Sequence, residues 1–120
     1  MFIQTYTVKI TTVGGDGVAA GSAETQEIYG FLLDILLNYH ASCPATADVT
    51  ISDATFGTIC VKTDNATDIR LAPRMATHDT AAAATPVYDY YPVSGPLTFS
   101  IAQANALTDC LVAIVRWLII

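Results

Sequence analysis

Charged side chains are scarce in this sequence, and basic ones are the scarcest. Only 13% of the 120 residues are charged, and five Lys and Arg stand against eleven Asp and Glu, so the formal net charge is −6. A soluble domain usually carries about 25% charged residues. The basic residues, Lys9, Lys62, Arg70, Arg74 and Arg116, do not cluster. Because nucleic-acid binding needs a basic patch, we expect no nucleic-acid partner.

Cysteine and histidine are also rare, and neither occurs at a metal-binding spacing. Cys43, Cys60 and Cys110 are far apart in sequence and form no CxxC pair. We expect buried free thiols, as in a protein folded in a reducing cytoplasm, and leave a disulfide as the less favoured alternative. His40 and His78 lie in no HxH or HxxxH pattern, so we expect no metal and no cofactor.

The sequence has no apolar run long enough to cross a bilayer as a helix. Segments 31–37 and 111–120 are apolar but fall well short of the roughly 20 residues that a helical span requires. The first residues lack the basic and apolar regions of a secretion signal. We therefore expect neither a membrane role nor secretion.

Catalytic and ligand-binding motifs are missing as well. Residues 14–17 (GGDG) have neither the Lys-Ser/Thr nor the helix of a phosphate-binding loop, so they predict a plain turn. Asp64, Asn65 and Asp68 lack the full calcium-loop spacing, which favours side chains that cap their own turn. His78 and Asp79 could belong to a small hydrolase, but no Gly-x-Ser-x-Gly accompanies them. We predict no catalytic residues and a protein that is not an enzyme.

What the sequence does contain is alternation typical of strands, above all in residues 96–120. Leu97, Phe99 and Ile101 alternate with small or polar residues, which predicts a strand with one buried face. Residues 110–120 are apolar except for Arg116. A strand of this kind cannot face water on either side, so we expect it to lie centrally in a sheet or beneath a partner subunit.

Further strands are predicted along the chain. In residues 2–13, Phe2, Tyr6, Val8 and Ile10 alternate with Thr and Lys, and residues 18–27 predict a return strand after the turn at 14–17. Two short strands are expected around a turn at residues 53–57. Residues 41–47 predict a loop because Pro44 excludes a central strand.

Residues 28–40 are ambiguous between strand and helix. A helix over residues 24–37 would place Ile28, Leu32, Ile35 and Leu36 on one face. We favour strand, because Gly30 is a poor helix centre but a natural kink or bulge. One strand face would then carry Phe31, Leu33, Ile35, Leu37 and Tyr39.

Residues 69–93 form the longest stretch without a regular spacing of apolar residues, and we predict a long loop there. It contains three prolines and the cluster Tyr88, Tyr90 and Tyr91. Long loops in compact domains are usually functional, and tyrosines near an arginine such as Arg74 are typical of interfaces. The alternative is a plain strand face for Tyr88 and Tyr90 with Tyr91 on the surface.

Three stretches resemble a known group of proteins. They are GGDGVAAGSA (14–23) leading into residues 30–39, TADVTIS (46–52), and LTFSIAQANA (97–106) before the final strand. In their general residue composition and their order along the chain, they are similar to the small β-sandwich structural proteins that tailed bacteriophages encode beside their capsid and tail genes. The resemblance implies a capsid cement or decoration subunit that binds the major capsid protein, works as a homo-oligomer such as a trimer, and uses no cofactor.

The sequence and this resemblance together predict an all-β fold, a single-domain antiparallel β-sandwich of jelly-roll type spanning residues 1–120. We expect a virion structural protein that assembles in the host cytoplasm and stabilises the shell, or else a neck, tail or fibre component. Another alternative is a carbohydrate-binding β-sandwich in which Tyr88, Tyr90 and Tyr91 form a stacking platform. The candidate interface lies in residues 70–91 and 2–6. Its residues are Phe2, Tyr6, Arg70, Arg74, Tyr88, Tyr90, Tyr91 and Trp117.

Overall fold

The computed structural model describes residues 2–119, which form eleven β-strands joined by turns, with no helix among them. The strands are β1 (Phe2–Ile10), β2 (Ala19–Glu24), β3 (Ile28–Tyr39), β4 (Asp48–Asp53), β5 (Gly57–Lys62), β6 (Ile69–Leu71), β7 (Arg74–His78), β8 (Ala84–Tyr90), β9 (Pro92–Gly95), β10 (Leu97–Ala104) and β11 (Leu111–Ile119). The predicted all-β class is confirmed.

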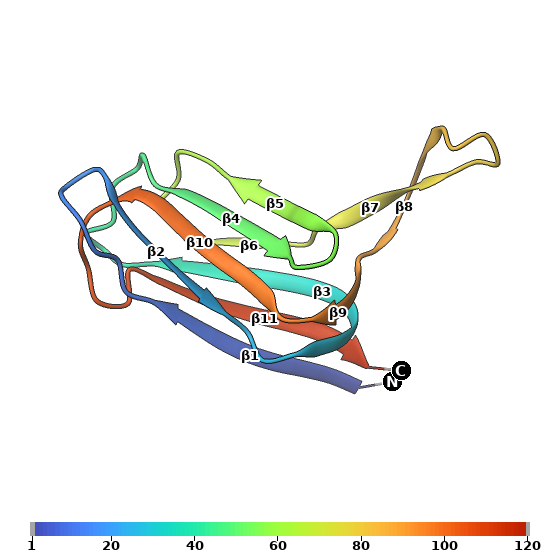
Figure 1. Cartoon of the computed structure of the whole chain (residues 1–120), viewed down its shortest axis with the longest axis horizontal. Helices are drawn as coiled ribbons and strands as arrows, with labels where there is room; N and C mark the ends of the chain where they lie inside the picture. Colours follow the sequence, from blue (N-terminus) through green and yellow to red (C-terminus); the bar gives the residue numbers. More distant parts are fainter. Residues whose placement is uncertain (1, 120) are drawn as a thin grey trace.

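Two antiparallel sheets make up the sandwich (Figure 1). The first sheet has the order β1-β11-β3-β6, with β9 also paired to β3, and the second has the order β2-β10-β4-β5. The chain passes from one sheet to the other at most connections, so all neighbouring strands in the two sheets except β4 and β5 are distant in sequence. A five-stranded and a four-stranded antiparallel sheet connected in this way are the arrangement of a jelly roll, as predicted.

Strand β11 lies at the centre of the first sheet, between β1 and β3. Its inward side chains, Leu111, Ala113, Val115 and Trp117, are buried in the core between the sheets. The predicted central position is therefore confirmed. The opposite face is only half covered, since Val112, Ile114 and Leu118 keep part of their surface exposed.

Residues 28–39 form one strand, so the helical alternative over residues 24–37 is wrong. The five residues predicted to share one strand face do so only from Ile35 onward, where Ile35, Leu37 and Tyr39 are buried. Asp34 pairs with Arg116 and Leu32 pairs with Trp117, which leaves Leu33 as an extra residue in a β-bulge. The bulge turns Leu32 into the core, while Phe31 and Leu33 remain half-exposed.

Two glycine-containing segments have the positive φ angles that the sequence indicated for a turn and for a kink or bulge. Gly14 and Gly17 have φ values of 131° and 78° in the turn after β1. That turn carries a bridge between Val13 and Ala20, but β1 and β2 then diverge into different sheets, so it does not close a simple hairpin. Gly30 has a φ of 151° beside β11, and a Cβ there would lie 2.0 Å from the carbonyl oxygen of Leu118.

The long loop predicted over residues 69–93 is wrong, because this segment contains β6, β7, β8 and the first two residues of β9. Strands β6 and β9 extend the first sheet, and β7 pairs with β8. Figure 1 shows the β7–β8 hairpin projecting beyond the sandwich at the end where the chain termini lie. We call residues 74–90 the arm.

Candidate functional site at the arm and its root

The arm is a two-stranded antiparallel ribbon whose strands pair with each other and with no other described strand. It gives the molecule an elongated shape, with extents of 49 × 30 × 23 Å. A two-stranded ribbon standing alone in water is marginally stable at best. The arm therefore needs support from its root, from a partner, or from both.

The root of the arm is attached to the edge of β3 that faces away from β11. Strand β9 pairs with one end of β3 and β6 with the other, so the arm leaves from the gap between them. In that gap the Leu32 N–H donates to the Tyr91 carbonyl at 2.9 Å. Nη1 of Arg74 donates to the carbonyl oxygens of Leu33 at 3.0 Å and Pro73 at 2.9 Å. The bulge at Leu33 thus presents a carbonyl that holds the arm.

Aromatic packing adds to these hydrogen bonds. The Arg74 guanidinium lies over the Tyr90 ring, 4.3 Å from its centroid, and the Phe31 ring lies 6.5 Å from the same ring at 56°. Cation–π and tilted aromatic pairs of this kind are attractive. The root is consequently fixed in direction, and the arm projects at a defined angle.

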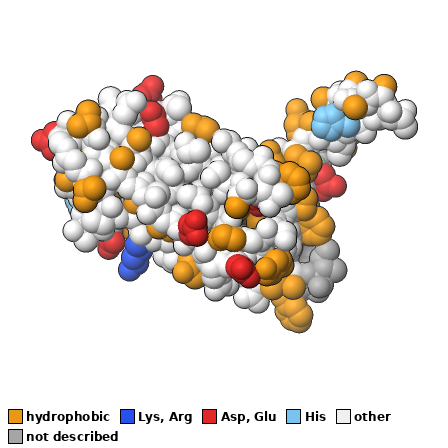
Figure 2. Space-filling view, in the orientation of Figure 1, with side chains coloured by type: hydrophobic (Ala, Val, Ile, Leu, Met, Phe, Trp, Pro, Cys, Tyr) orange, Lys and Arg blue, Asp and Glu red, His pale blue; other side chains and the backbone are white. Residues whose placement is uncertain are grey.

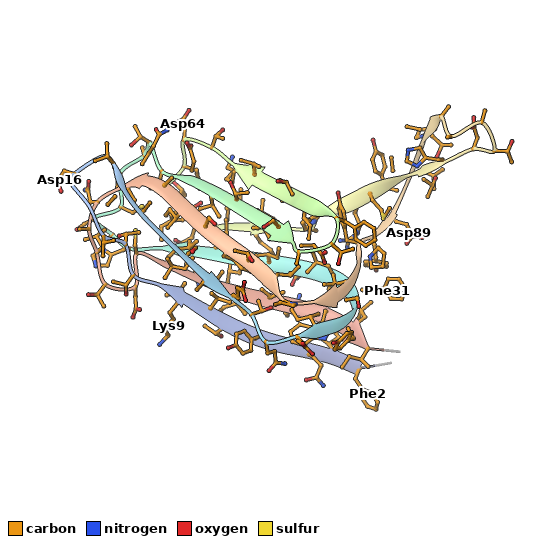
Figure 3. All side chains as sticks on the ribbon, viewed as in Figure 1. Phe2, Lys9, Asp16, Phe31, Asp64 and Asp89 are labelled. Atoms are coloured by element: carbon orange, nitrogen blue, oxygen red, sulfur yellow. The ribbon has the colours of Figure 1, made fainter. Side chains whose placement is uncertain are left out.

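Beyond the root, the arm exposes apolar side chains. Val87 and Tyr88 are 60% and 65% exposed, and Met75 is also exposed. Figure 2 shows hydrophobic side chains gathered where the arm meets the sandwich and at the chain termini below it. Phe2 and Phe31 lie at this end, whereas Asp16 and Asp64 lie at the opposite end (Figure 3). Apolar surface concentrated in this way is typical of an interaction site.

A shallow hollow lies between the β4–β5 turn and the arm root. It is lined by Asp53, Phe56, Gly57, Thr58, Ile59, Met75, Tyr91 and Pro92. Phe56 is 82% exposed at its rim. The turn that carries Phe56 is held by the buried Asp53, whose carboxylate accepts the N–H groups of Thr55 at 2.7 Å and Phe56 at 3.1 Å.

An ion cluster occupies the outer face of the first sheet beside the root. Nε of Arg116 donates to Asp34 at 2.7 Å and Nε of Arg70 donates to the same carboxylate at 2.8 Å. The hydrogen bonds from Arg116, followed by those from Arg70, lower the pKa of Asp34 against the opposing effect of its burial. Both arginines remain partly exposed and line a second hollow with Leu36 and Ile114.

The structure brings most of the predicted interface residues to one end of the molecule. Arg74, Tyr88 and Tyr90 belong to the arm, Tyr91 follows it, and Arg70 lies on β6 next to its root. Phe2 and Tyr6 lie on β1, at the far edge of the first sheet.

Trp117 does not belong to this surface. Its side chain is 2% exposed and lies in the core, so a partner has no access to it in this structure. Trp117 is buried because its side chain points to the same side of β11 as those of Leu111, Ala113 and Val115, which are also buried.

The three tyrosines of the proposed stacking platform do not form one plane. Tyr88 and Tyr90 have the same parity on β8, but Tyr90 is covered by Arg74 and Phe31. Tyr91 packs against the core. Phe56 is an exposed aromatic at the hollow that the sequence did not single out, and its position in a short turn after a buried strand was the available signal.

Asp79 and Asn65 are hydrogen-bonded within their own turns, but Asp68 bonds to strand β3 and so does not cap its own turn as predicted. Asp79 accepts the N–H groups of Ala81 at 2.9 Å and Ala83 at 3.0 Å at the arm tip, next to the exposed His78. Asp68 accepts the Tyr39 N–H at 2.8 Å, and Asn65 donates to the Thr67 carbonyl. Within residues 2–119 no three His, Cys, Asp or Glu side chains are close enough to hold a metal ion, and no helix is long and apolar enough to cross a membrane.

Comparisons with known proteins give remote structural matches only. No protein-family model matches the chain, and no curated protein matches it. The C-terminal CBM6 of LamC, a laminarinase of Zobellia galactanivorans, matches with a TM-score of 0.43 and 6% identity over 95% of this chain and 99% of that one. The mitogen of Yersinia pseudotuberculosis matches at 0.40 and 13%, over 98% and 86% of the two chains. The carbohydrate-binding module CBM6cm-2 of the Cellvibrio mixtus lichenase 5A, in complex with cellotriose, matches at 0.38 and 14% over the whole of both chains. Similarity at this level carries nothing about binding.

Proposed function

We propose that this protein is a structural subunit that assembles with copies of itself through the arm, and that the assembly is part of a virion. The observation that carries the proposal is the arm, a ribbon fixed at its root but bare along both strands. Jelly rolls occur both in viral capsid proteins and in lectin-like domains, so the fold does not decide between these functions. The arm favours assembly.

The chemistry of the arm suits contact with another copy of this chain. Its charged residues are Arg74, Asp79 and Asp89, and Arg74 is already engaged at the root. The stretch between the two aspartates is uncharged and exposes Val87 and Tyr88. Because the whole chain has a net charge of −6, copies repel one another in general, and a nearly uncharged arm lets them approach at one place.

The virion part of the proposal draws on the resemblance of the sequence to phage cement and decoration proteins. A subunit of that kind would bind the major capsid protein as an oligomer in the assembled particle. Low charge and the projecting arm agree with such a role. This part is more specific than self-assembly and needs its own test.

Self-assembly is tested by light scattering at micromolar concentration. We expect the natural chain to be an oligomer, and a Val87→Asp, Tyr88→Asp double variant to be a monomer because it places charge on both faces of the ribbon. Val18→Asp is the matched control, since Val18 is also highly exposed but lies in the turn that carries Asp16, which Figure 3 shows at the opposite end. A monomeric natural chain, or an oligomer that the double variant leaves intact, would overturn the proposal.

The virion part is tested on particles purified by density gradient from cells that express the gene. Mass spectrometry should find this chain with the major shell protein in the particle fraction, in a fixed ratio to it. The double variant should remain at the top of the gradient. A natural chain that remains there too, although it is oligomeric, would remove the virion part and leave self-assembly standing.

Carbohydrate binding is a second candidate, favoured by the hollow at the arm root. Phe56 presents an exposed ring there, with Tyr91 and the hydroxyl of Thr58 close by, and aromatic rings beside a few polar groups are a common way to hold a ligand. A glycan array with the natural chain tests it. A signal that Phe56→Ala abolishes and Phe2→Ala retains would support sugar binding, because Phe2 is exposed but lies on β1. An empty array would dismiss it.

A further inference from the structure

Two of the three cysteines meet in the core at the end of the sandwich opposite the arm. Cys43 lies in the loop between β3 and β4, and Cys110 directly precedes β11. They are 67 positions apart in sequence, yet their Sγ atoms are 3.8 Å apart, and both residues are buried. The third cysteine, Cys60, lies half-buried on β5 in the other sheet.

Backbone hydrogen bonds hold the two cysteines together. The pair Tyr39 and Leu111 ends the β3–β11 ladder, and one step further the His40 N–H donates to the Cys110 carbonyl at 2.9 Å. The Cys43 N–H then donates to the His40 carbonyl, also at 2.9 Å, and this turn folds Cys43 back over Cys110. The contact between the two sulfur atoms is therefore set by the sheet.

From this geometry we infer that Cys43 and Cys110 are a disulfide-forming site, reduced in a thiol-rich environment and closed by a disulfide oxidant such as oxidised glutathione. One thiolate attacks the glutathione disulfide, forms a mixed disulfide and releases one glutathione thiol. The second thiolate attacks the mixed disulfide and releases the other. The protein loses two protons and two electrons, and the two glutathione molecules gain them. The inference does not depend on the proposed function.

Burial determines how the reaction can proceed. Exclusion from water, with a smaller contribution from Cys110, raises the pKa of the Cys43 thiol to about 12. Since the thiolate is the reactive form, the folded protein should react slowly, and glutathione must enter through a transient opening of residues 40–47. Once the bond is closed, the same burial should protect it from reductants.

The test uses the purified full chain, incubated with oxidised glutathione at a temperature just below its unfolding transition, so that local opening does not limit the reaction. Remaining thiols are alkylated, and the chain is cleaved at its aspartates. Asp48 and Asp53 separate Cys43 from Cys60, so each cysteine falls in its own peptide. We expect a linked pair of peptides containing Cys43 and Cys110, with a mass two hydrogens lower than the sum of the two reduced peptides. Cys60 should be recovered in alkylated form. The melting temperature should rise on oxidation, because the cross-link closes a long loop.

Matched variants separate this pairing from general oxidation. Cys60→Ser should keep the linked peptides and the rise in melting temperature, and Cys43→Ser should lose both. The peptide map of the natural chain gives the answer even where a variant fails to fold. Recovery of Cys43 and Cys110 as alkylated thiols, or as separate glutathione adducts, would overturn the inference.

Discussion

The guanidinium of Arg74 lies over the ring of Tyr90, its cross-strand partner at the root of the arm. The same guanidinium donates to the Leu33 carbonyl on β3, so one side chain links the arm to the sandwich. The arm itself has no other strand beside it among the described residues. Its orientation therefore depends on a few contacts, and these are the contacts that a mutation can remove.

Arg74→Ala should loosen the arm without unfolding the sandwich. The change removes a cation–π contact and the hydrogen bonds to the Leu33 and Pro73 carbonyls, which together contribute about 1–2 kcal/mol. Hydrogen exchange should speed up in residues 75–89 and stay slow in β3 and β11. Lys9→Ala removes an exposed cation elsewhere and should leave both regions unchanged. Equal acceleration throughout the chain would show that Arg74 supports the whole fold instead.

Asp34→Asn should destabilise the protein at neutral pH and much less in acid. Arg116 and Arg70 lower the pKa of the folded Asp34 carboxyl below its unfolded value of about 3.9. The carboxylate therefore stabilises the fold above that value, and its contribution is lost as the pH falls through the lower, folded pKa. Urea unfolding midpoints of the natural chain and the variant should differ at pH 7 and converge at strongly acidic pH.

The control for this pH dependence is Asp16→Asn, in an exposed turn that makes no ion pair among the described residues. Its midpoint should follow that of the natural chain at every pH. If the difference in urea midpoint between the natural chain and Asp34→Asn stays constant into acid, the shape of the side chain matters and its charge does not.

Gly30→Ala should cost about 2–4 kcal/mol of unfolding free energy, through strain and a steric clash. A methyl group there would lie 2.0 Å from the Leu118 carbonyl oxygen, and the backbone φ of 151° is one that side chains disfavour. Gly15→Ala is the comparison, because its new methyl meets only a Val18 methyl at 3.4 Å. Chemical denaturation should show a large loss for the first and little change for the second.

The strands that alternation marks clearly are the ones that the sequence predicts well. The run from Leu111 onward has to be central because it is apolar on both faces, and the structure places it between β1 and β3. Arg116 is the one polar residue of the run and has to lie on the outer face, so its neighbour Trp117 lies on the inner face, which would have removed Trp117 from the predicted interface. The sequence held this information, but the prediction did not use it.

Other features depend on contacts between distant residues and could not be read from local patterns. The bulge at Leu33 inverts the faces of β3 before Asp34, and it is set by pairing with β11. The strands of the arm lack an apolar face because they cover no core, so their residues read as a loop. The meeting of Cys43 with Cys110 follows from the sheet order, which sequence spacing alone does not reveal.

Tyr39→Phe should leave the stability unchanged or raise it by up to about 1 kcal/mol, because the tyrosine hydroxyl is buried at a cost. Within residues 2–119 the Tyr39 Oη makes no hydrogen bond of normal geometry, and burial raises its pKa against the opposing effect of the nearby Asn65 side chain. The nearby backbone is well satisfied, since the Tyr39 N–H donates to Asp68. Tyr39→Ala is the contrasting variant and should lose about 3–5 kcal/mol, because it empties a core position next to Cys43 and Cys110. Urea unfolding of the three chains at neutral pH measures both effects. A broken buried hydrogen bond costs about 1 kcal/mol or more, so a loss of that size in Tyr39→Phe would show that the hydroxyl has a partner in solution.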